Sequence, residues 1–163
     1  MKVVRFGVVG ACAVILSLVA GFATLAGDCV DADFSGLITQ AVPGGLTEGD
    51  VDLVIDGVSQ TAHMTVTIVR AKATEDGTQE TDWAVTFDLG DGNTFGGLFH
   101  GVLSPTEPLE FRANAQGKIT EGTGGFEDVL GKMVIHGTFS VLLNPVWAEF
   151  EGTGNGKLCD IEP

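Results

Sequence analysis

The chain has 163 residues, with 8 Lys and Arg against 22 Asp and Glu, a formal net charge of −14. Nucleic acids and anionic membrane surfaces are bound through clustered Lys and Arg, so this balance argues against both partners. Hydrophobic residues make up 44% of the chain, which is enough for a core and argues against a wholly disordered protein.

Residues 1–26 have the three-part layout of a secretory signal peptide. A short cationic start, Met1–Arg5, precedes an uncharged apolar run that ends at Thr24-Leu25-Ala26. Small residues at positions −3 and −1, here Thr24 and Ala26, favour cleavage after Ala26. The apolar run of about 20 residues is also long enough to span a bilayer, so an uncleaved membrane anchor is the alternative. Cleavage leaves residues 27–163 as one exported domain with 6 basic and 22 acidic residues, a net charge of −16.

The segment after Ala26 alternates apolar and polar residues repeatedly, the period of β-strands with one buried face. No window shows a sustained helical period. In chain order the predicted strands cover residues 34–39, 51–55, 62–68, 82–89, 95–103, 109–114, 133–143 and 146–151. The patterns at 34–39, 51–55 and 109–114 are weaker than the others.

Turn-forming residues separate these strands. The turn signals are Pro43-Gly44-Gly45, Asp56-Gly57, Asp76-Gly77, Asp91-Gly92 and Asn144-Pro145. Asp-Gly steps favour hairpins because these turns need positive φ, and short connections predict antiparallel neighbours.

Glycines inside the strand patterns favour a closed sheet over a flat one, because they permit the bends that closure requires. These glycines are Gly96, Gly97, Gly101, Gly137 and Gly152. We therefore predict an all-β fold, a single antiparallel barrel of about eight strands, with no internal repeat or linker.

One segment resembles a known family. Gly122, Gly124, Phe126 and Gly131 form the pattern Gly-Thr-Gly-x-Phe, four residues, Gly, followed by a strand. This pattern resembles a signature of the allene oxide cyclase and dirigent-like barrels, and it is similar to segments of many secreted bacterial proteins of unassigned role. The resemblance implies a barrel whose apolar cavity steers a reactive intermediate. The pocket residues of that family lie outside the motif. A closing turn at one end of the barrel, with Phe126 filling apolar space, is the structural interpretation.

Two of the three cysteines lie near the ends of the predicted domain. Cys12 belongs to the signal segment, whereas Cys29 and Cys159 remain after cleavage. Disulfides persist outside the cytoplasm, and the termini of a compact domain often lie close together. We therefore expect one disulfide, Cys29–Cys159, in a secreted or periplasmic protein; the alternative is two unpaired thiols near frayed ends.

Candidate metal ligands are few. His63, His100 and His136 fall on three different predicted strands. Converging faces would make a three-His zinc site, whereas separate faces would leave three histidines on the outer wall. Acidic clusters around Asp50, Asp76 and Asp91 are either weak calcium ligands or solvated turns.

No motif names an enzyme. The chain has no Gly-x-Ser-x-Gly elbow and no phosphate-binding glycine loop before a helix, and we expect no cofactor. The leading hypothesis is an exported, non-enzymatic barrel module that binds a small apolar ligand in the barrel mouth, with no nucleic acid or membrane partner. The alternatives are a cofactor-free catalyst of the cyclase or dirigent-like kind and a metal-dependent surface protein. The ligand and the oligomeric state do not follow from the sequence.

Overall fold

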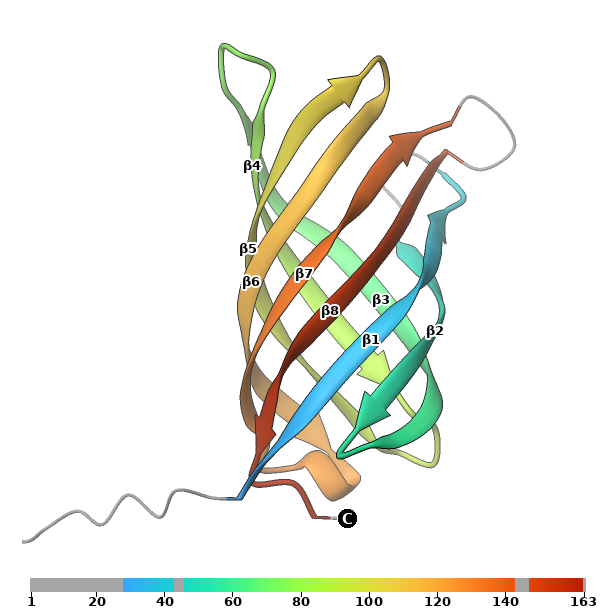
Figure 1. The fold of residues 1–163 in the computed structure, drawn as a ribbon, viewed down its shortest axis with the longest axis vertical. Coiled ribbons are helices and arrows are strands. Elements are labelled where there is room, and N and C mark those ends of the chain that lie inside the picture. The colour runs from blue at the N-terminus through green and yellow to red at the C-terminus, as the bar shows by residue number, and fades with distance from the viewer. Residues whose placement is uncertain (1–27, 43–45, 143–146, 163) are drawn as a thin grey trace, which may run out of the picture.

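The computed structural model describes residues 28–42, 46–142 and 147–162, which form a closed antiparallel barrel of eight strands (Figure 1). The strands are β1 (Cys29–Gln40), β2 (Thr47–Ile55), β3 (Val58–Ala73), β4 (Gln79–Asp88), β5 (Thr94–Glu107), β6 (Glu110–Thr123), β7 (Leu130–Val141) and β8 (Ala148–Cys159). The predicted all-β barrel is confirmed. The predicted signal segment, the Pro43-Gly44-Gly45 turn and the Asn144-Pro145 turn lie outside the described residues.

The barrel closes where β1 pairs with β8. Their register runs from Cys29 opposite Cys159 to Gln40 opposite Ala148. The other seven pairings join strands that follow each other in the chain, so only this one brings distant segments together. The predicted Cys29–Cys159 disulfide is confirmed, and it lies at one end of this pairing. We call that end of the barrel the disulfide end.

Two of the three predicted Asp-Gly turns have positive φ at both residues, whereas at Asp76-Gly77 only the glycine does. Asp56 and Gly57 link β2 to β3 with φ values of 51° and 76°. Asp91 and Gly92, between β4 and β5, have φ values of 53° and 81°. Positive φ at successive residues matches the right-handed twist of the flanking strands, so these turns fix tight hairpins at the disulfide end.

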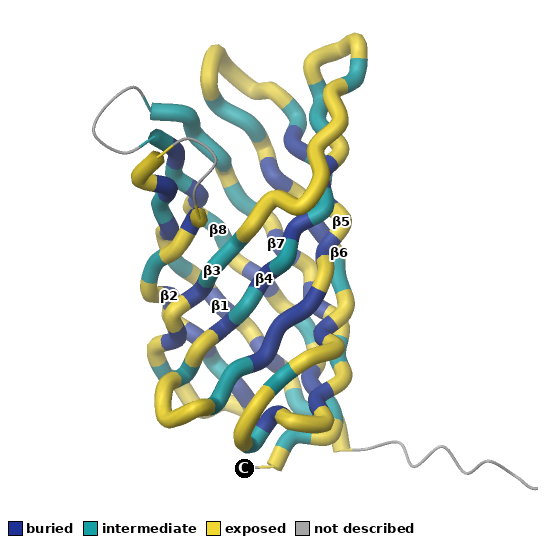
Figure 2. The backbone as a smooth tube through the Cα atoms, turned by 180° about the vertical axis from the view of Figure 1, so that it is seen from behind, coloured by how far each residue is buried: buried dark blue, intermediate teal, exposed yellow. Residues whose placement is uncertain are grey.

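Buried and exposed residues alternate along the strands, as the bands of colour in Figure 2 show, because successive side chains of a strand lie on opposite faces of the sheet. On β4, for example, Thr81, Trp83, Val85 and Phe87 are all buried and point inward. The residues between them face outward. This alternation makes the interior a single core and leaves the acidic residues on the outer wall.

Aromatic rings fill the disulfide end. Phe87 lies 5.2 Å from Phe34 and 4.9 Å from Phe95 between ring centroids. Phe95 in turn lies 5.1 Å from Phe126, which comes from the single 3₁₀ turn, η1 (Gly124–Phe126). Because Phe87 and Phe95 are fully buried, this end of the barrel is packed solid.

Inward-facing glycines make room for large rings on neighbouring strands. A Cβ atom at Gly101 would lie 2.9 Å from Trp83 Cζ2, and one at Gly154 would lie 2.9 Å from Phe34 Cζ. Real Cβ atoms do not approach so closely, so each ring occupies space that a side chain would need. The strand glycines therefore pack large against small inside a narrow barrel, in addition to permitting curvature.

Candidate functional site

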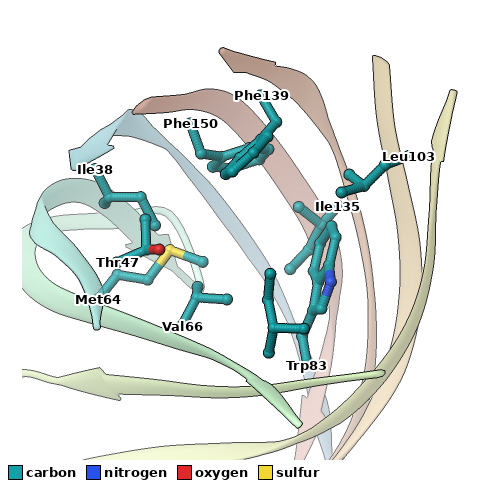
Figure 3. Close-up of a pocket in the computed structure, with 10 residues that line it drawn as sticks. Ile38, Thr47, Met64, Val66, Trp83, Leu103, Ile135, Phe139 and Phe150 are labelled. Atoms are coloured by element: carbon teal, nitrogen blue, oxygen red, sulfur yellow. The ribbon is translucent and has the colours of Figure 1, made fainter. Parts of the chain in front are cut away.

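The end of the barrel opposite the disulfide contains an apolar cavity of about 30 Å³ (Figure 3). Every strand except β6 contributes to its wall, and the lining side chains point toward a common space. They are Ile38, Thr47, Met64, Val66, Ile68, Trp83, Leu103, Ile135, Phe139 and Phe150. The volume suits about two waters or the end of a small apolar molecule.

The cavity has a deep part and a rim. Met64, Trp83 and Ile135 are at most 5% exposed and form the deep wall. Ile68 is 44% exposed and Phe139 is half-buried, so these two side chains lie at the rim. The Phe150 ring meets the Trp83 indole nearly edge-on, with centroids 6.4 Å apart. The wall is thus aromatic on two sides and, apart from the Thr47 side chain, aliphatic elsewhere.

Two polar atoms in the barrel wall are buried without a hydrogen-bond partner among the described residues. They are Trp83 Nε1 and Thr81 Oγ1. Both lie beside Gly101, where an added Cβ atom would be 3.1 Å from Thr81 Oγ1 and 3.1 Å from Trp83 Cε2, the ring carbon bonded to Nε1. Buried polar groups are nearly always paired, and an unpaired one costs about 1–3 kcal/mol. These two atoms therefore lie buried in the sheet beside Gly101 without a partner among the described residues.

Sequence reasoning missed this pair of atoms. The predicted strand began at residue 82, so Thr81 was not assigned to the barrel wall, whereas the structure includes it in β4. Its position two residues before Trp83 was the available signal, because residues two apart share a face of a strand.

No carboxylate lies in the interior of the described barrel, where the buried polar side chains are Gln40, Thr47 and Thr81. Glu149 and Glu151, which lie two apart on β8, face outward together with the other acidic residues. The cavity therefore offers mainly apolar contact to an occupant, and its described wall supplies no carboxylic acid or base.

The three histidines lie on the outer wall, on β3, β5 and β7, and the structure does not bring them together. Each bonds through Nδ1 to the residue directly opposite on a neighbouring strand, at 2.9–3.0 Å. The pairs are His63 with Asp50, His100 with Asp82 and His136 with Asn114. Across residues 28–42, 46–142 and 147–162, no three or more His, Cys, Asp or Glu side chains form a group that could hold a metal ion.

Two of these surface contacts shift a pKa. The hydrogen bond with Asp50 raises the pKa of His63, and Glu48, whose Oε2 lies 3.6 Å from His63 Nε2, adds to the effect. The hydrogen bond with His100, followed by that with Arg70, lowers the pKa of Asp82. These side chains are all at least partly open to water, so their ion pairs contribute little to stability.

The Gly-Thr-Gly-x-Phe segment lies at the disulfide end, away from the cavity. Gly122 ends the inward row of β6, Gly124 and Phe126 bound η1, and Gly131 lies in β7. Gly124 has φ of +62°, and a Cβ atom at Gly122 would overlap the carbonyl oxygen of Phe126. The sequence predicts one short turn from Phe126 to Leu130; in the structure η1 comes first, and a turn from Phe126 to Val129 follows it, closed by the hydrogen bond that Val129 N–H donates to the Phe126 carbonyl. None of the four motif residues lines the cavity.

Comparison of the chain with models of known families, with curated proteins and with solved structures finds no match in any of the three. In the part of the chain that the structure describes, no helix has the length and apolar character needed to cross a membrane.

Proposed function

We propose that the protein is an exported, non-enzymatic binding module that holds the apolar end of a small ligand in the cavity. The observation that carries this proposal is the unequal filling of the barrel. One end is packed solid by four aromatic rings, whereas the other contains a cavity whose lining is apolar in nine of ten residues. Burial of apolar surface is the driving force that such a site offers.

The size of the cavity limits the ligand. Sites for drug-sized molecules have volumes of roughly 300–1,000 Å³, far above the 30 Å³ of this cavity. The occupant therefore inserts only a short or thin apolar group, and the remainder lies at the rim beside Ile68 and Phe139. A larger insertion would require these two side chains to move.

The Cys29–Cys159 disulfide supports the export part of the proposal, because such bonds persist in oxidising compartments. The N-terminal layout of charges and apolar residues supports it independently. Mass spectrometry of the protein from its own host tests this point. We expect the mature chain to begin at Gly27, and a chain that begins at Met1 would contradict cleavage.

A cofactor-free catalyst of the cyclase or dirigent-like kind is the second candidate. The observation that favours it is an apolar cavity inside a closed eight-stranded barrel, in a chain whose 122–131 segment resembles those families. The described wall supplies no buried carboxylate, so binding is the stronger proposal. Native mass spectrometry separates the two, because a binding module releases its ligand unchanged.

The direct test fills the cavity. Propane, a short and thin apolar probe, should shift the methyl NMR signals of Met64 and Ile135, which lie in the deep wall. Val66→Phe places a ring in the cavity and should abolish the shift. Val134→Phe, on the outer face of β7, is the matched control and should leave it intact. Equal shifts in all three proteins, or no shift in any of them, would refute the proposed function.

A further inference from the structure

We infer that an open hollow on the outer wall of the barrel binds a small organic ammonium ion. The hollow has a volume of about 560 Å³ and is lined by residues of β1, β7 and β8, which lie side by side in the sheet (Figure 1). This volume falls within the range of small-molecule sites, roughly 300–1,000 Å³. No residue lines both the hollow and the cavity inside the barrel, so this site goes beyond the proposed function.

Three glycines in register lie at the centre of the lining. Gly36 on β1 is opposite Gly152 on β8, and Gly152 is opposite Gly137 on β7. Side chains exposed to water stand around this bare backbone. They are Ser35 and Leu37 from β1, His136 from β7, and Glu151 and Thr153 from β8. The polar atoms of the hollow are therefore accessible to a ligand that arrives from solvent.

His136 contributes a hydrogen-bond acceptor. Its Nδ1 lies 2.9 Å from Asn114 Oδ1, and because an amide oxygen only accepts, Nδ1 carries the proton. The neutral imidazole therefore keeps its lone pair on Nε2. Asn114 lies on β6, on one side of β7, whereas the hollow extends from β7 toward β8 and β1 on the other side. The bond with Asn114 thus occupies the side of the ring next to β6 and leaves Nε2 for the hollow.

The charges at the site favour a cation. Glu151 is the charged side chain of the lining, none of the lining residues is basic, and Glu151 forms no ion pair with another described residue. Asp52, directly opposite Ser35 on β2, places a second carboxylate beside the hollow. The chain has a net charge of −14, so the surrounding field attracts cations and repels carboxylates and phosphates.

An ammonium group matches the acceptors of the hollow. It has three N–H donors and no acceptor, and it meets the Glu151 carboxylate, His136 Nε2 and the Thr153 hydroxyl oxygen. Hydrogen bonds to charged groups are about twice as strong as neutral ones. Leu37, which is 49% exposed, provides apolar contact for the carbon skeleton of the amine. The ligand class is therefore an organic amine with a small apolar body.

The experiment compares three probes of one shape, cyclohexylamine, cyclohexanol and cyclohexanecarboxylate, at pH 8 and low salt. Cyclohexylamine is an ammonium ion at this pH, and all three rings are too large for the cavity of about 30 Å³ inside the barrel. We expect the ammonium ion to bind most tightly, cyclohexanol weakly and the carboxylate not at all. Binding of the ammonium ion should weaken as the salt concentration rises.

NMR of the histidine ring nitrogens locates the bound probe. The Nε2 signal of His136 should move when cyclohexylammonium binds, because this nitrogen accepts a hydrogen bond from it. His63 and His100 do not line the hollow, so their signals are internal references. Binding that leaves the His136 signal in place would locate the amine elsewhere and overturn the inference.

Two variants of β8 test the role of charge. Glu151→Gln should weaken cyclohexylammonium binding by about 3- to 10-fold, the worth of one charge-assisted hydrogen bond at an exposed site. Glu149→Gln is the matched control, because it makes the same change two residues away and outside the hollow. It should change the affinity by less than about 2-fold.

Two further results would overturn the inference. Equal losses in Glu151→Gln and Glu149→Gln would show that the amine responds only to the net charge of the wall. Equal binding of cyclohexanol and cyclohexylammonium would show that the hollow does not recognise the ammonium group. Neither result concerns the cavity inside the barrel, so the proposed function stands or falls separately, by its own test with propane.

Discussion

Removal of the Cys29–Cys159 disulfide should destabilise the protein strongly without changing its fold. The bond joins residues 130 apart in the chain, at one end of the β1–β8 pairing, which among the described strands is the one that closes a long loop. In the chain-entropy model, a cross-link over a loop of this length stabilises by about 5 kcal/mol, because it restricts the unfolded chain. Single domains are stable by about 5–15 kcal/mol in total. The stability of the reduced protein should therefore be marginal. Its β1–β8 register still includes all the remaining residue pairs, from Val30 opposite Leu158 to Gln40 opposite Ala148.

Urea unfolding of the oxidised protein and of the double variant Cys29→Ala/Cys159→Ala measures this effect. We expect the midpoint to fall and the m-value to rise, because an unfolded chain without the cross-link exposes more surface. The far-UV circular dichroism of the two folded proteins should agree. A reductant should reproduce the loss in the wild type and have no effect on the double variant, which is the control. A loss below about 1 kcal/mol, or a changed folded spectrum, would refute the entropic reasoning.

Three further predictions concern the core and the surface. Gly154→Val places a side chain where the Phe34 ring lies and should cost about 1–3 kcal/mol in urea unfolding; the outward-facing Asn155→Val should cost much less, and equal losses would contradict the packing of ring against glycine. Phe126→Ala removes a ring that is only 9% exposed and should cost about 3–5 kcal/mol; a loss under 1 kcal/mol would show that Phe126 does not close the barrel. The His63 pKa should exceed 6.5 in an NMR titration because of the Asp50 hydrogen bond, so this contact stabilises fully below pH about 6.5 and is lost as the pH rises through the folded pKa. Asp50→Asn should lower that pKa, and an unchanged value would contradict the assigned cause.

The fold followed from local patterns in the sequence. Period-two alternation and Asp-Gly turns are properties of short segments, so they predicted the number, order and antiparallel pairing of the strands. Strand lengths were less predictable. β6 extends from Glu110 to Thr123, well beyond the predicted 109–114. Its inward row contains the small residues Ala113, Ala115 and Gly117, so it lacks the large apolar side chains whose alternation predicts a strand. Those small residues face a crowded interior, as the Phe99 ring over Gly117 illustrates.

The sequence also predicted the disulfide, because two cysteines near the ends of one exported domain allow a single pairing. The alternation predicted that His63, His100 and His136 face away from the apolar rows. Only the closed barrel decides whether the three histidines come together. They lie apart because β3, β5 and β7 are not neighbours in the sheet.

The sequence by itself determined an all-β chain with Trp83 pointing inward and cysteines at both ends, because each of these features depends on neighbouring residues or on chain position. Only the tertiary structure decided the site. Closure of the barrel sets which side chains from seven strands surround one cavity and places Thr81 opposite Gly101 beside the Trp83 indole. No local pattern encodes these contacts, since they depend on the register of strands that meet around a closed sheet.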